Sequence, residues 1–126
     1  MELGNQFGNV EHQYVAPAGS DKRARLQAHH EGRVVSEVSW YPGSNTIHSA
    51  WTDENYQKNG LASGLVREIA QNHMPTYPNG RQAQLNHSTN RSPAGDALAH
   101  RTADFTYVPR NVNAPRGQRY IDPGLG

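Results

Sequence analysis

The chain has 126 residues, a length that suits one domain with a modest core. Apolar residues make up 34% of it, the formal net charge is +1 and the mean hydropathy is −0.88. The near-balanced charge argues against nucleic acid or an anionic membrane as partner. The chain holds no cysteine, which excludes disulfides, thiolate metal sites and a cysteine nucleophile.

The N-terminus has neither a basic nor an apolar region of the secretory type, and no run is apolar enough to span a membrane. We therefore expect a cytoplasmic protein. Residues 1–22 are rich in Gly, Asn and Gln and predict an N-terminal arm, with a turn at residues 17–20.

Three strands are predicted next, over residues 23–29, 34–41 and 46–51. Short turns at residues 31–32 and 42–45 join them into an antiparallel meander. On the third strand, alternation places Ile47, Ser49 and Trp51 on one face and His48 and Ala50 on the other.

A helix follows, because apolar residues recur at four-residue spacing. Leu61, Leu65 and Ile69 form a stripe that predicts core packing. Pro75 ends the element. Trp40 and Trp51 are expected to be core or interface anchors.

The second half of the chain predicts a short strand at 82–86, a helix from Ser92–Pro93 to about Thr102 and a strand at 105–108. The fold class is then α/β (α+β), with a mixed central sheet in which the antiparallel meander is followed by two crossover helices. The core spans residues 23–109, and residues 110–126 are expected to form an extended C-terminal tail.

The junction between the third strand and the first helix is the strongest functional signal. Gly60 lets the backbone approach a ligand closely, and the first helical turn offers unpaired N–H groups at the positive end of the helix dipole. The junction therefore predicts a site for a phosphorylated ligand. The alternative is an ordinary glycine-containing helix start.

This order of elements, with this loop, resembles the GCN5-related N-acetyltransferase (GNAT) superfamily. The family's acyl-CoA motif, Gln/Arg-x-x-Gly-x-Gly/Ala, stands here as Gln57-x-x-Gly60-x-Ala62 after residues 53–56. Residues 86–100 look like the fourth helix region of some actinobacterial and phage GNAT-like proteins. The similarity covers roughly residues 23–108.

The resemblance implies direct transfer of an acyl group from acetyl-CoA to an amine. It implies that the strand 46–51 pairs with the pantetheine arm, and that one of its N–H groups polarises the thioester carbonyl. It also implies that backbone N–H groups of residues 59–63 hold the pyrophosphate, within a cofactor-binding junction made of Gln57, Lys58, Asn59, Gly60, Leu61, Ala62 and Ser63.

Two histidines are the catalytic candidates. His48 is the only titratable side chain on the third strand, so it is the candidate base; the alternative is a strand histidine that faces solvent. His100 stands where the resemblance places a tyrosine acid; the alternative is a surface helix histidine.

No metal site is expected, because no pair among the seven histidines has the helical i, i+4 spacing of a zinc site. A second hypothesis is a non-catalytic structural or assembly component, such as a phage virion protein that reuses a GNAT-like fold. It would bind copies of itself or other assembly subunits, and its location would be the virion. The polar composition, the short stretch before Arg23 and the long C-terminal arm favour it.

Overall fold

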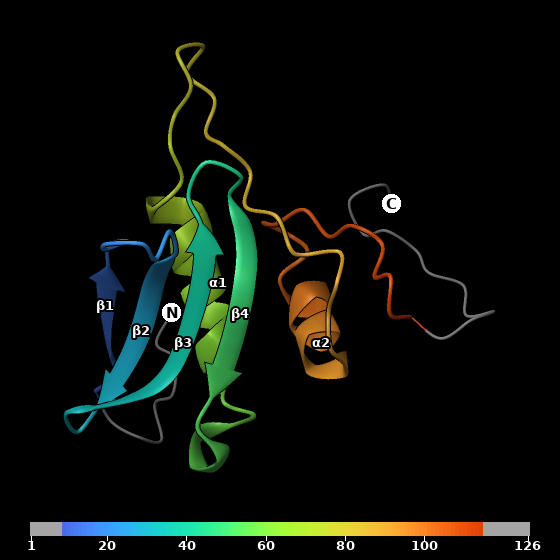
Figure 1. Cartoon of the computed structure of the whole chain (residues 1–126). Coiled ribbons are helices and arrows are strands. Elements are labelled where there is room, and N and C mark those ends of the chain that lie inside the picture. Colours follow the sequence, from blue (N-terminus) through green and yellow to red (C-terminus); the bar gives the residue numbers. More distant parts are fainter. Residues whose placement is uncertain (1–8, 115–126) are drawn as a thin grey trace.

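The computed structural model describes residues 9–114. Its centre is a four-stranded antiparallel sheet in the order β1–β2–β3–β4 (Figure 1). The strands are β1 (Glu11–Val15), β2 (Ala24–His30), β3 (Arg33–Tyr41) and β4 (Thr46–Thr52). Helix α1 (Leu61–Asn72) lies against one face of the sheet, and helix α2 (Pro93–Arg101) lies beyond β4. The predicted combination of helices with an antiparallel meander is confirmed.

Strand β1 lies in the segment that was expected to be an N-terminal arm. It pairs with β2, with Tyr14 opposite Leu26. Two side-chain contacts hold it over α1: His12 Nδ1 lies 2.7 Å from Glu68 Oε1, and the Tyr14 ring stacks on His73 with 5.0 Å between ring centroids. The polar sequence of β1 does not predict a strand, because the pairing and packing of β1 depend on residues far away in the chain.

A β-bulge in β4 overturns the predicted faces of that strand. Trp40 pairs with Ile47 and Ser39 pairs with Ser49, so His48 is an extra residue between the two pairs. Ile47 therefore packs in the core beside Trp40, and Ser49 bonds to the Ser39 hydroxyl at 2.7 Å. Trp51 is 44% exposed and is not a core residue; any role of Trp51 as an interface anchor stays a prediction.

The core lies between α1 and the sheet. The predicted stripe Leu61, Leu65 and Ile69 is buried, as are Leu26 and Trp40 on the strands opposite. Gly64 is also buried on this side of α1. The helix period therefore identified the packing face of α1 correctly.

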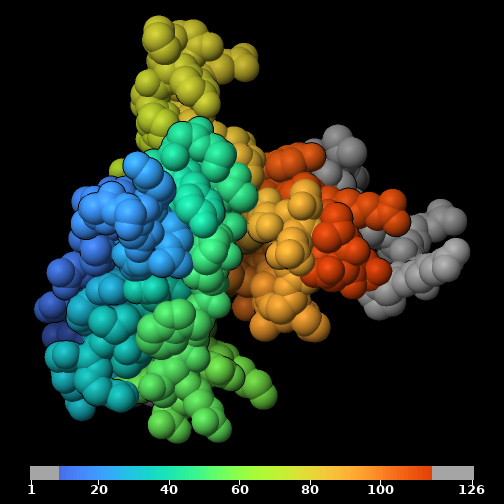
Figure 2. All heavy atoms as spheres, in the orientation of Figure 1, coloured from blue at the N-terminus to red at the C-terminus, as the bar shows by residue number. Residues whose placement is uncertain are grey.

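The second half of the chain adds a helix and no further strands to the described structure. The predicted strands at 82–86 and 105–108 are present only as single parallel bridges, Thr46 to Asn86 and Asn86 to Tyr107. Residues 75–83 form a hairpin that projects from the body, which Figures 1 and 2 show clearly. The sheet is thus antiparallel, with a parallel extension too short to count as strands. Most of the predicted C-terminal tail, from residue 115 on, lies outside the described residues.

Candidate functional site

A cleft separates β4 from α2. Next to the β3–β4 turn the two sides are joined, because the Ile47 N–H donates to Asn86 O and the Asn86 N–H donates to Asn45 O, both at 2.8 Å. Further along β4 the chain after Asn86 moves away, and two hollows of about 570 Å³ and about 240 Å³ lie between them. Ala50, Ser92, Gly95 and Leu98 line both hollows, so the hollows form one continuous cleft, between the green and orange regions of Figure 2.

The exposed edge of β4 faces this cleft. The Asp53 N–H donates to Val35 O at 2.8 Å, just past the end of the strand. Main-chain groups alternate in direction along an antiparallel strand, so those of Thr52 and Ala50 point away from β3. Gln57 Nε2 donates to Thr52 O at 3.2 Å, consistent with this direction. Ala50 therefore presents an N–H and a C=O to a ligand lying in the cleft.

The larger hollow ends at the junction before α1. Gly60 and Lys58 both adopt left-handed backbone conformations, with φ of 75° and 64°. Asn59 braces the turn by donating from Nδ2 to Gln57 O at 2.8 Å and to Tyr56 O at 3.2 Å. A positive φ is strained for a lysine, and the hydrogen bonds of Asn59 help to keep Lys58 in this conformation.

The N–H groups of the first turn of α1 are directed at this end of the cleft. The first intrahelical bond runs from the Gly64 N–H to Gly60 O at 2.9 Å, so the N–H groups of residues 61–63 precede it. Gly60 provides no side-chain cap. Six of the seven predicted cofactor-binding residues line the larger hollow: Gln57, Lys58, Gly60, Leu61, Ala62 and Ser63. Asn59 does not line it; its side chain supports the loop.

The charge of the larger hollow is positive. Lys58 and Arg101 line it, and no Asp or Glu is among the described residues that do so. Arg101 reaches from α2 to the start of α1, and its Nε donates to Ser63 Oγ at 3.4 Å. Two cations and a free helix N-terminus thus converge on one end of the cleft, an arrangement that suits an anion such as a pyrophosphate.

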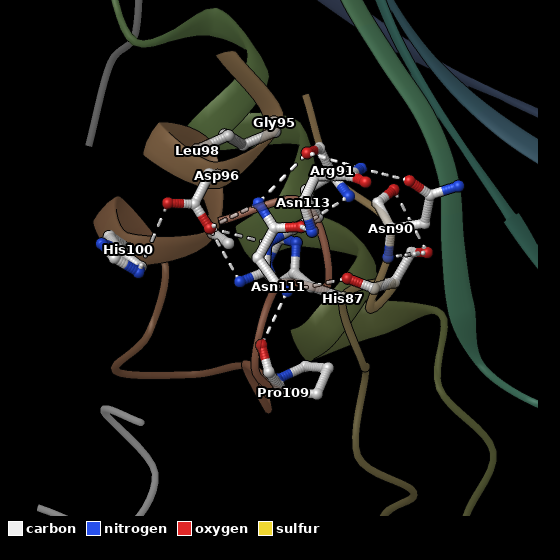
Figure 3. Close-up of polar contacts among 12 residues, drawn as sticks. His87, Asn90, Arg91, Gly95, Asp96, Leu98, His100, Pro109, Asn111 and Asn113 are labelled. Atoms are coloured by element: carbon white, nitrogen blue, oxygen red, sulfur yellow. Dashed lines mark hydrogen bonds and ion pairs between the residues drawn. The ribbon is translucent and has the colours of Figure 1, made fainter. Parts of the chain in front are cut away.

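The two predicted catalytic histidines are not brought together. His48 is exposed at the bulge of β4 and lines the smaller hollow, with its Nδ1 3.4 Å from the Arg23 guanidinium. His100 is exposed on α2 and lines neither hollow. Its Nε2 lies 3.8 Å from Asp96 Oδ2, on the far side of Asp96 from Arg91 (Figure 3).

His87 also lines the smaller hollow, although it was not among the predicted site residues. It is only 3% exposed, and its Nε2 lies 2.9 Å from Thr102 Oγ1. Burial lowers the pKa of His87 to about 4, and the nearby positive charges of Arg91 and His100 act in the same direction. The sequence signal for its burial is the alternation that places His87 on the same face as the apolar Ala83 and Leu85.

A buried arginine fixes the wall of the cleft that carries His87. The Arg91 guanidinium donates to Asp96 Oδ1 from NH2 at 2.8 Å and from Nε at 3.0 Å, and from NH1 to Ser88 O at 2.7 Å and Pro109 O at 2.8 Å (Figure 3). The Asn111 side chain accepts from the Arg91 N–H at 3.1 Å. These bonds lock residues 88–91 to the start of α2 and to the segment that follows residue 109.

Other kinds of site find no support between residues 9 and 114. That part of the chain has no cluster of three or more His, Asp or Glu side chains placed to hold a metal. None of the helices described there is long and apolar enough to cross a membrane.

Comparison with models of known protein families gave no match. A search of curated proteins and a search of solved structures gave none either. The function of the cleft therefore has to be argued from its own geometry and from the motif at Gln57–Ala62.

Proposed function

We propose that this protein binds an acyl-CoA in the cleft between β4 and α2 and transfers the acyl group to an amine, as a GNAT-like acetyltransferase. One observation carries the proposal. The cleft ends at a glycine-initiated helix N-terminus flanked by Lys58 and Arg101, with no carboxylate among its described lining residues. Backbone N–H groups and two cations there complement a pyrophosphate.

The rest of the cleft fits an extended ligand that runs from this end toward the smaller hollow. Ala50 borders both hollows and turns its main-chain groups into the cleft, so it can pair with the amides of a pantetheine arm. The thioester carbonyl would then lie near the bulge at His48, where a main-chain N–H of β4 stabilises the negative charge of the transition state.

Proton transfer is assigned to His48 as the candidate base, because it borders the smaller hollow and is exposed. His100 lines neither hollow, so we give it no part in the proposed reaction. The nitrogen of the acceptor forms a bond to the acyl carbon, the C–S bond breaks, and the thiolate of CoA takes up the proton that the nitrogen loses.

Calorimetric titration with acetyl-CoA tests the proposal. We expect the wild-type protein to release heat and Gly60→Asp to abolish it, since a carboxylate at the helix start repels the pyrophosphate. Gly32→Asp is the matched control: Gly32 has a φ of 77°, close to the 75° of Gly60, but lies in the β2–β3 turn. No heat from the wild type, or equal loss in both variants, would contradict the proposal.

A non-catalytic assembly component is the second candidate, and the projecting hairpin of residues 75–83 favours it (Figure 2). Tyr77 on this hairpin is 51% exposed, as expected of a side chain that packs on another subunit. Light scattering distinguishes the candidates. A particle larger than one chain that becomes monomeric in Tyr77→Ser supports assembly, whereas a monomeric wild type contradicts it.

A further inference from the structure

The hydrogen bonds around His87 determine which of its nitrogens carries the proton. The Thr102 hydroxyl donates its hydrogen to the main chain of α2, with Leu98 O at 3.0 Å and Ala99 O at 3.3 Å. Because the hydrogen of that hydroxyl points to carbonyl oxygens that can only accept, we assign the 2.9 Å contact between Thr102 Oγ1 and His87 Nε2 as a hydrogen bond that the histidine donates. His87 is therefore protonated on Nε2, and its Nδ1 carries a lone pair.

That lone pair is open to the smaller hollow. Among residues 9–114 no buried side-chain nitrogen or oxygen lacks a hydrogen-bond partner. Nδ1 of His87 makes no hydrogen bond to the described residues, so it is not sealed in the core, and we assign its opening to the hollow that His87 lines. Because His87 is almost fully buried, its ring is held in place and Nδ1 is a fixed acceptor at the cleft wall.

The surroundings of Nδ1 disfavour a cation. No Asp or Glu is among the described residues that line either hollow. Burial is the main cause that lowers the pKa of His87, with the positive charge of Arg91 acting in the same direction, and both effects also penalise an ammonium group placed beside the ring. An uncharged N–H donor is not penalised by burial of charge or by nearby positive charge, and it can hydrogen-bond to the lone pair of His87 Nδ1.

We propose that the smaller hollow seats the acyl acceptor as a nucleophile that is uncharged at neutral pH, of the arylamine class, with His87 Nδ1 accepting its hydrogen bond. This inference rests on the proposed acyl transfer. Because the acceptor already has a free nitrogen lone pair, His87 has only to orient it. The nitrogen attacks the acyl carbon and the C–S bond breaks. The departing thiolate of CoA then takes up the proton that the nitrogen loses.

Binding of two amines of similar size tests the inference without acetyl-CoA. Aniline is uncharged at neutral pH, whereas cyclohexylamine is protonated. Nitrogen NMR of the histidine rings should show the Nε2–H form of His87 in the free protein and a shift of the Nδ1 signal on addition of aniline. We expect cyclohexylamine to bind at least about tenfold more weakly, a difference of about 1.4 kcal/mol.

Variants assign the effect to His87. We expect His87→Phe to lose aniline binding, and His29→Phe, on β2 and outside both hollows, to keep it. Tighter binding of cyclohexylamine, an Nδ1–H form of His87 in the free protein, or binding of neither amine would overturn the inference. The amine binding measurements do not involve CoA, so they test the acceptor site alone. Titration of His87→Phe with acetyl-CoA tests the acyl-CoA site separately. If this variant still releases heat with acetyl-CoA but no longer binds aniline, the result supports both the acyl-CoA site and the acceptor site.

Discussion

At the scale of single residues, His87 makes stability depend on pH. Its pKa is about 4 in the folded protein and near 6.5 in the unfolded chain. Between these values the unfolded chain binds more protons, so the free energy of unfolding falls as the pH falls from 6.5 toward 4. The shift corresponds to about 3 kcal/mol from this group.

Urea denaturation at several pH values measures this loss. Carboxylates titrate over part of the same range, so the informative quantity is the difference between the wild type and His87→Gln, which has no titrating group. We expect the wild type to lose more stability than the variant as the pH falls to about 4. Parallel curves for the two proteins would show that folding does not lower the pKa of His87.

Asn111 is a second residue whose burial gives it weight. Its Oδ1 accepts from the N–H groups of Arg91 and Asn113, both at 3.1 Å, and it is 6% exposed. Asn111→Ala leaves a buried N–H without a partner, which costs roughly 2 kcal/mol. In Asn79→Ala the lost bond, to the Arg81 N–H at 2.9 Å, lies in an exposed turn, so we expect the chemical denaturation midpoint to move much less. Equal shifts of the denaturation midpoint in the two variants would mean that water reaches the main-chain N–H of Arg91 in Asn111→Ala.

At the scale of elements, α2 forms one wall of the cleft and depends on its N-terminal cap. Ser92 Oγ accepts from the Gly95 N–H at 3.1 Å, and Pro93 occupies the first turn. Ser92→Ala should lower the free energy of unfolding by about 1 kcal/mol. In Ser44→Ala the lost contact is an exposed hydroxyl bond of 3.4 Å, so we expect no measurable change in thermal denaturation.

The elements that were predicted correctly are those whose signals are local. The cap at Ser92 and the apolar period of α1 identify two helices from neighbouring residues alone. By contrast, β1 was missed because only pairing with β2 makes its polar sequence a strand. The bulge at His48 was missed as well, and strict alternation therefore placed Trp51 on the wrong face.

The same division applies to the cleft. The junction at Gln57–Ser63 was predicted, because glycine and helix-start chemistry are readable in sequence. Arg101 and His87 were not, since their place depends on how α2 and residues 86–91 pack beside β4. Burial of His87 is a property of the whole fold, and it lowers the pKa of a residue that looks ordinary in the sequence.

At the scale of the whole molecule, the net charge of +1 gives little general attraction for an anionic ligand. Attraction must therefore be local, and Lys58 and Arg101 are the cations that line the larger hollow. We expect Lys58→Gln and Arg101→Gln each to weaken acetyl-CoA binding by up to about fivefold at low salt, because both side chains are exposed and exposed ion pairs contribute up to about 1 kcal/mol. Raising the salt concentration should reduce the difference from wild type.

Arg81→Gln provides the matched control, since it removes one positive charge from the projecting hairpin and leaves the cleft lining unchanged. If all three variants weakened binding equally, the attraction would come from overall charge and not from the cleft. If the two cleft variants bind more weakly while Arg81→Gln matches wild type, the fold itself, by bringing α2 beside the start of α1, creates a positive site that the balanced composition conceals.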